Sequence, residues 1–224
     1  MRLQKNLSVG SYAALRSLAL ISLSIFILST VSAYSQTQAA KAPVVFTEKD
    51  REFALKYLGE TKDDFVKQIT GISDAQLNFR PAPDKWSVAE VAEHIIVSEG
   101  TILGLIQGQI LKSPENVSDV FRAKDTGVIL AITNRSQKFT APEMLKPAAR
   151  FKNREDLLSS FEKARNQTIE FVKSNKINMR GHFFENPLMG MIDGYQWLLF
   201  LNGHTERHLS QLKEVKANAA YPSK

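Results

Sequence analysis

Three of the four histidines in this 224-residue chain stand at spacings that suit a metal site. His204 and His208 are four residues apart near the end of the sequence. A four-residue step on an α-helix returns to nearly the same face, so both imidazoles can point at one ion. His94, which follows a helix-start signal at Ser87, supplies a third nitrogen. Three nitrogens without a fourth protein ligand leave a position for water or substrate, which favours a catalytic site over a structural one.

A partly solvated helix face is the alternative setting for His204 and His208. Both histidines continue an apolar stripe formed by Leu201, Leu212 and Val215. Imidazoles within such a stripe are buried, and buried imidazoles need partners, which a metal provides. We therefore predict that the pair binds metal, while the sequence identifies no general base or other catalytic residue.

Taken alone, His94 is better explained as a hydrogen-bonded core histidine than as a metal ligand. It lies among the apolar positions Val91 and Ile95, on the side of its helix that should face the core. Glu90, one turn earlier, has the spacing of an S-x-x-E capping box with Ser87. We predict that Glu90 caps the helix and does not orient the His94 ring.

The remaining polar candidates have simpler interpretations. His204 does not begin an H-E-x-x-H motif, and Glu206 projects to nearly the opposite side of the helix, which excludes it as a zincin-type base. Glu206 and Arg207 are predicted on the surface or in inter-helix salt bridges. His182 is predicted to be structural or solvent-facing, with a place at the mouth of a cleft as the alternative. Packing against apolar neighbours is predicted for Trp86 and Trp197.

Residues 1–33 are predicted to be a secretory signal peptide. Arg2, Lys5 and Arg16 precede an apolar run at 18–31, and Val31-Ser32-Ala33 resembles a cleavage site. The apolar run is shorter than a spanning helix needs, and no cysteine is present for a lipid anchor. We expect export to the periplasm or the outside of the cell, without a stable membrane anchor after cleavage.

The composition limits the classes of function. Removing residues 1–33 from 224 leaves 191, enough for one core, and lowers the net charge from +6 to +3 because the segment holds three basic and no acidic side chains. Without a dense basic block, nucleic-acid binding is not expected. The chain has no cysteine, so it forms no disulfide and any metal is bound through nitrogen or oxygen.

Apolar spacing and capping signals predict four long helices. They span 47–69, 87–111, 153–173 and 193–218, with a short helix at 128–138, a loop at 180–191 and no β-strand. The predicted domain organisation is a linker at 34–46, one domain at 47–218 and a tail at 219–224. Four long amphipathic helices favour an all-α four-helix bundle with a metal site between helices.

The sequence resembles the DinB-like superfamily in two places. Lys85-Trp86-Ser87 followed by His94 matches the first motif, and H-T-E-R-H-L-S-Q at 204–211 matches the second. The similarity extends over roughly 47–216. It implies a four-helix bundle and a divalent metal held by three histidines, which correspond to His94, His204 and His208.

The resemblance implies less about the reaction than about the metal. We expect a divalent-metal-dependent hydrolase that uses metal-activated water. The alternatives are a thiol S-transferase, as in some relatives, and a non-catalytic metal- or ligand-binding stress-associated protein. Export disfavours thiol transfer, because an exported protein does not meet the cytoplasmic thiol cofactors on which such transferases depend. Zinc or nickel is the preferred ion, with manganese or iron as alternatives. The sequence does not identify the small-molecule substrate, and it leaves open whether the chain forms a homodimer.

Overall fold

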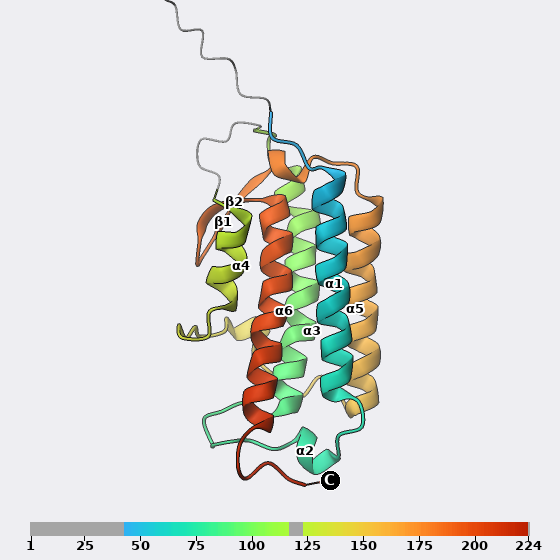
Figure 1. Cartoon of the computed structure of the whole chain (residues 1–224), viewed down its shortest axis with the longest axis vertical. Coiled ribbons are helices and arrows are strands. Elements are labelled where there is room, and N and C mark those ends of the chain that lie inside the picture. The colour runs from blue at the N-terminus through green and yellow to red at the C-terminus, as the bar shows by residue number, and fades with distance from the viewer. Residues whose placement is uncertain (1–42, 117–122, 224) are drawn as a thin grey trace, which may run out of the picture. The chain divides into compact units, whose positions relative to one another are not determined.

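The computed structural model describes residues 43–116 and 123–223. Four long helices lie side by side in this part of the chain: α1 (Glu48–Ile69), α3 (Val88–Gly108), α5 (Arg154–Ser174) and α6 (Gly194–Lys216) (Figure 1). The predicted all-α four-helix bundle is therefore confirmed. The predicted signal peptide at 1–33 and residues 34–42 of the predicted linker lie outside the described residues.

The helix starts follow from local side-chain caps. Thr47, Ser87 and Asp193 each accept a hydrogen bond from the backbone N–H three residues later and complete a capping box. Asn153 accepts from the Asp156 N–H at the start of α5. These oxygens satisfy backbone donors that have no partner within the helix, so each start falls where the sequence predicts it.

A polar layer separates two apolar clusters in the bundle core. On α1, Leu58 belongs to one cluster and Phe65 to the other, and Thr61 lies between them. The Arg165 guanidinium donates from Nε and Nη2 to the two Glu99 carboxylate oxygens, both at 2.8 Å, and both side chains are fully buried. This bidentate pair fixes how α3 and α5 are aligned along the bundle.

The short helix predicted at 128–138 is wrongly placed: α4 spans Asp125–Thr133 and packs on α6. Its contact is close because Gly203 has no side chain; a Cβ there would lie 2.4 Å from Cγ2 of Ile132. After Thr133 the chain turns, and the Asn134 side chain accepts from the Ser136 N–H at 2.9 Å. This side-chain turn competes with further helix.

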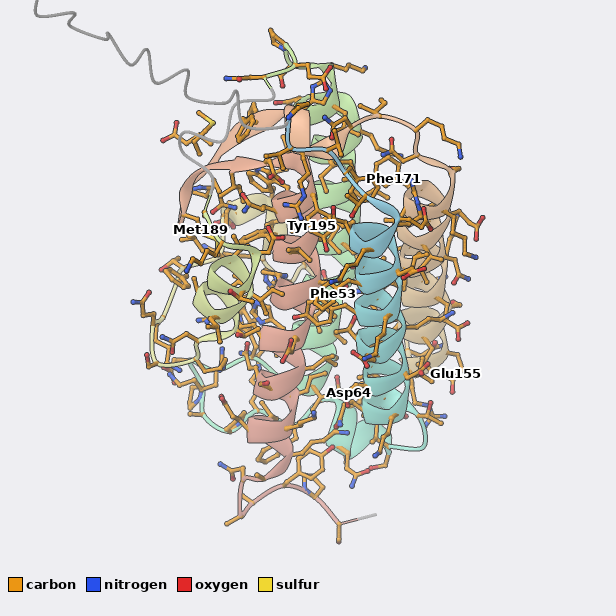
Figure 2. All side chains as sticks on the ribbon, turned by 45° about the horizontal axis from the view of Figure 1, so that its top comes forward. Phe53, Asp64, Glu155, Phe171, Met189 and Tyr195 are labelled. Atoms are coloured by element: carbon orange, nitrogen blue, oxygen red, sulfur yellow. The ribbon has the colours of Figure 1, made fainter. Side chains whose placement is uncertain are left out.

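Residues 180–191, predicted as a loop, contain most of a β-hairpin. Strand β1 (Phe183–Asn186) pairs antiparallel with β2 (Gly190–Asp193), with Phe183 opposite Asp193 and Asn186 opposite Gly190. Gly190 has φ of 70°, a conformation that favours glycine and closes the turn that contains Met189 (Figure 2). The prediction of no strand was wrong, because four-residue strands are too short to show clear alternation.

Four single-turn elements complete the described fold, among them η2 (Glu143–Leu145) after α4 and η3 (Met179–Gly181) before β1. Helix α2 (Asp74–Leu77) is capped by Ser73 within the segment predicted to be irregular, and η1 (Ile110–Lys112) extends α3 by a 3₁₀ turn. Side chains fill the space between the long helices, with Phe171 and Tyr195 toward the same end of the bundle (Figure 2). Helix α3 is long and apolar enough to cross a membrane by composition, but more than half of that stretch is buried in the bundle.

Candidate metal centre

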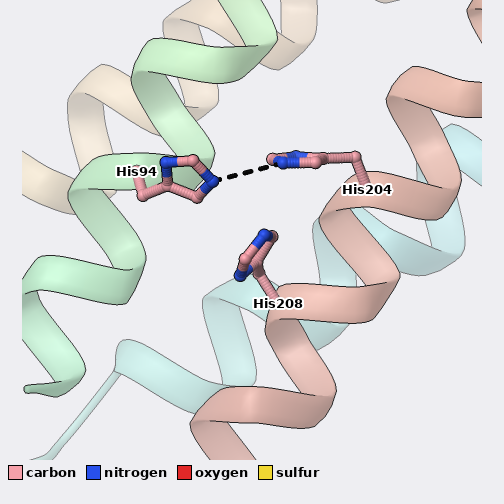
Figure 3. Close-up of side chains that lie close together, drawn as sticks. All are labelled: His94, His204 and His208. Carbon is pink, nitrogen blue, oxygen red and sulfur yellow. Dashed lines mark hydrogen bonds between the residues drawn. The ribbon is translucent and has the colours of Figure 1, made fainter. Parts of the chain in front are cut away.

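The three predicted histidines converge between α3 and α6. His94 projects from α3, and His204 and His208 project from neighbouring turns of α6 (Figure 3). One ring nitrogen from each lies within 4.8 Å of the others, and the Nε2 atoms of His94 and His204 are 3.2 Å apart. The fourth histidine, His182, lies elsewhere: it is buried, and its Nδ1 lies 2.8 Å from the Ser113 carbonyl oxygen.

Two of the rings are oriented by oxygen atoms behind them. Nδ1 of His94 lies 2.8 Å from the Leu145 carbonyl oxygen, and Nδ1 of His208 lies 2.8 Å from Oε1 of Gln211. Such oxygens only accept, so each Nδ1 carries the hydrogen of a neutral imidazole. The Nε2 lone pairs of His94 and His208 are therefore left for another partner, as is common around metal-binding histidines.

Glu90 takes no part in orienting His94. Its carboxylate accepts from the Ser87 N–H at 2.7 Å, and it forms an ion pair with Arg80. The predicted capping role is confirmed. The acceptor behind His94 comes instead from Leu145, which is distant in the sequence.

A second carboxylate on α3 holds the segment that carries this acceptor. Glu93, which is buried, accepts from the Ala148 N–H at 2.7 Å and from the Arg150 guanidinium at 2.6 Å. Leu145 is three residues before Ala148, so these bonds keep its carbonyl against α3. The sequence contains no local sign of this contact, since Glu93 and Ala148 are 55 positions apart.

Burial keeps the three imidazoles neutral. Burial lowers the pKa of His94, and it lowers the pKa of His204 well below the ordinary value of 6.5. Electrostatic repulsion from His208 and His94 lowers the pKa of His204 further. Burial, followed by the charge of His94, lowers the pKa of His208 to about 3. Neutral imidazole is the form that binds metal, so the site needs no proton release near neutral pH.

The separation of the His94 and His204 nitrogens fits one small divalent ion. Two nitrogen ligands about 2.1 Å from a tetrahedral zinc ion lie about 3.4 Å apart, close to the 3.2 Å between His94 and His204. The donor set also fits, because three neutral nitrogens suit zinc, nickel and related ions. No fourth His, Cys, Asp or Glu belongs to this cluster within the described residues.

The histidines open into a cleft of ≈ 850 Å³. Its apolar walls include Trp86, whose ring centroid is 5.0 Å from that of His94, and the edge-to-face pair Trp197 and Phe200. Leu145 and Leu188 contribute further apolar surface. The predicted packing role of the tryptophans is incomplete, because both also line the cleft. A cleft of this size with a few convergent polar groups is typical of a small-molecule site.

Arg207 is buried, contrary to the predicted surface or salt-bridge position. Its guanidinium donates to the backbone carbonyl oxygens of Ile132, Asn134 and Gln137, at 3.2 Å for Ile132. These bonds hold the segment after α4 against α6. Glu206 points to α1, where it accepts from the Tyr57 hydroxyl, and is thus absent from the metal centre.

Comparisons with known proteins identify the family and support the fold. The model of the DinB superfamily matches residues 57–212. The uncharacterized protein YuaE of Bacillus subtilis is 24% identical over 162 residues, which cover 72% of this chain and 96% of YuaE. The solved structure of YfiT from Bacillus subtilis superposes with a TM-score of 0.53 and 12% identity, covering 79% of this chain and 91% of YfiT. YfiT is described as a probable metal-dependent hydrolase with an unusual four-helix bundle topology.

Proposed function

Because the chain belongs to the DinB superfamily, we propose that it is a metal-dependent hydrolase whose divalent ion is held by His94, His204 and His208. The observation that carries the proposal is the convergence of one ring nitrogen from each histidine. The Nδ1–H groups of His94 and His208 are hydrogen-bonded to oxygen atoms, which leaves Nε2 of both rings for a metal ion. The description of YfiT as a probable metal-dependent hydrolase supports the same class of reaction.

The chain's own residues would position the ion and the substrate. His94, His204 and His208 would hold a divalent ion on the floor of the cleft, with zinc or nickel preferred and manganese or iron as alternatives. Such an ion polarises a carbonyl or phosphoryl oxygen and lowers the pKa of water towards 7. Leu145 and Gln211 fix the rings of His94 and His208, and the apolar side chains of the cleft would contact the bound substrate.

A non-catalytic metal- or ligand-binding protein is the second candidate, and one observation favours it. The two carboxylates that line the cleft, Asp84 and Glu214, are each paired with a cation, Lys85 and Arg135 respectively. A general base works best when it is free to take up a proton. A thiol S-transferase stays the third candidate, and it has no specific support from the geometry.

Hydrolysis of chromogenic esters, amides and phosphoesters by metal-loaded protein tests the proposal. We expect turnover that a chelator abolishes, that added zinc or nickel restores, and that the His208→Ala protein lacks. Ligand-dependent stabilisation without turnover of any of these compounds would favour the binding role instead. Turnover only with an added low-molecular-weight thiol would favour thiol transfer.

We also propose that the protein is exported after cleavage near Ala33, on the basis of the basic, apolar and small-residue order of residues 1–33. Intact-mass measurement of protein from its native cell tests this. A mature chain that begins near Tyr34 and is found outside the cytoplasm is expected. Soluble cytoplasmic protein that still carries residues 1–33 would contradict it.

A further inference from the structure

One wall of the cleft carries an excess of positive charge. Three cations line it, Arg135, Lys138 and Arg207, together with the single carboxylate of Glu214. Arg135 donates to both Glu214 oxygens, at 3.1 and 2.6 Å, so that pair is neutral as a unit. We call Lys138 and Arg207, which have no such pairing, the basic wall.

The two cations of the basic wall form no direct ion pair, and they share the charge of the Glu214 carboxylate with Arg135. Arg207 donates to backbone carbonyl oxygens, and neither Arg207 nor Lys138 forms an ion pair with another described residue. The Arg207 guanidinium lies beside the segment that carries Lys138, because it donates to the carbonyl of Gln137 and lies 5.1 Å from the centroid of the Phe139 ring. The carbonyl oxygens satisfy donors of the buried Arg207 guanidinium, but three cations around one carboxylate leave an excess of positive charge that an anion would balance.

Much of the remaining cleft lining is apolar, although Asp84, Lys85, Lys146, Thr140 and Gln211 also line it beside the three histidines. Trp86, Trp197 and Phe200 offer flat surfaces near the histidines, and Phe139 continues this surface to the basic wall. A neutral apolar compound would leave the cations uncompensated, and a small inorganic anion would leave the aromatic surface exposed. A ligand that has both an apolar body and an anionic group satisfies both.

We infer that the cleft binds an apolar, aromatic-sized compound that carries a carboxylate or phosphate group, with the anion at Lys138 and Arg207 and the apolar body on Trp86, Trp197 and Phe200. The inference rests on the proposed function in that it names the substrate class of the same site. It concerns binding, so it is tested on metal-free protein, where a carboxylate has no ion to coordinate.

The test uses three compounds with one phenylbutyl body: 4-phenylbutyrate, 4-phenylbutyl phosphate and 4-phenylbutanol. Calorimetric titration of the metal-free, full-length protein at low ionic strength should show at least one of the anions binding about tenfold or more tightly than the alcohol, and this preference should shrink with added salt. The tighter of the two anions identifies the headgroup. Equal affinity for all three compounds, or no binding, would overturn the inference.

Two charge-reversal variants localise the effect without touching the buried guanidinium. Lys138→Glu should weaken binding of the preferred anion about threefold to tenfold and leave the alcohol unchanged, as expected for one exposed charge. Lys176→Glu, at an exposed lysine that does not line the cleft, changes the net charge equally and should change neither. Equal losses in both variants would overturn the placement of the anion.

Failure of this inference can be told apart from failure of the proposed function. Chelator-sensitive hydrolysis without a preference for anions would contradict only the ligand class. Selective binding of an anion by protein that hydrolyses nothing would contradict only the hydrolase.

Discussion

The Nδ1–H of His94 donates to the carbonyl oxygen of Leu145 across 2.8 Å, although the two residues are 51 positions apart. The first lies on α3 and the second at the end of a short 3₁₀ turn, η2 (Glu143–Leu145), in the segment between α4 and α5. This bond leaves Nε2 of His94 facing His204. The orientation of the metal centre therefore depends on a segment outside the four helices.

Gln211 should set the metal affinity through His208. Replacement by leucine removes the oxygen that accepts from Nδ1–H, so the ring loses its fixed tautomer and part of its basicity. We expect the affinity for zinc to fall about 10- to 100-fold, as for other residues that orient metal ligands. Competition with a chromophoric chelator measures it. Gln211→Glu keeps an acceptor and should keep most of the affinity; equal losses in both variants would contradict the role.

Glu93 should stabilise the segment that contains Leu145. In Glu93→Leu the Ala148 N–H and the Arg150 guanidinium lose their acceptor, and because both residues are exposed, each lost hydrogen bond should cost about 0.5–1.5 kcal/mol. Hydrogen exchange at residues 144–150 should accelerate, and zinc affinity should fall as well. Glu143→Gln, in an exposed ion pair with Lys146, is the control and should alter neither. Unchanged exchange in Glu93→Leu would refute the prediction.

The helix starts were predictable from the sequence because their causes are local. Ser87 and Glu90 satisfy each other's backbone N–H groups within one turn, and Asp193 and Gln196 do the same, so the residue types and spacing suffice. The approach of His204 to His208 was likewise a consequence of helix geometry.

The surroundings of the histidines were not predictable, because they depend on contacts between distant segments. Nothing near Leu145 in the sequence indicates that its carbonyl meets His94, and the contacts of Arg207 are with backbone atoms of another segment, which have no sequence signature. The hairpin at 183–193 was missed because pairing between two four-residue strands outweighs their weak local pattern.

The buried Arg165–Glu99 pair should be essential for stability. Arg165→Met leaves the Glu99 carboxylate without its cation in the core, which costs about 3–5 kcal/mol of unfolding free energy. Urea unfolding followed by circular dichroism checks this. The exposed pair Lys173 and Glu170 provides the comparison, since Lys173→Met should cost at most about 1 kcal/mol. Similar losses in both variants would contradict the assigned importance of the buried pair.

Metal-free protein should lose stability in mild acid because of its buried histidines. The pKa of His208 is about 3 in the folded chain and 6.5 as the ordinary value, so the unfolded chain takes up the proton first. Protonation of the unfolded chain then favours unfolding. The resulting loss of unfolding free energy is absent above about pH 7 and grows as the pH falls from about 6.5 towards 3. Urea unfolding between pH 7.5 and 4.5 should show a steeper loss for the natural protein than for His208→Gln. Parallel curves would count against the buried neutral imidazole.

Metal content is the most direct test of the three-histidine centre. The protein and its His208→Ala and His182→Ala variants are loaded with zinc or nickel and desalted. Their metal content is then measured by elemental mass spectrometry. We expect about one ion per chain in the natural protein and in His182→Ala, and severe loss in His208→Ala with helicity retained by circular dichroism, since one of three nitrogens is gone while the apolar core remains. Full occupancy in the His208→Ala protein would contradict the assignment of His94, His204 and His208 as the metal ligands.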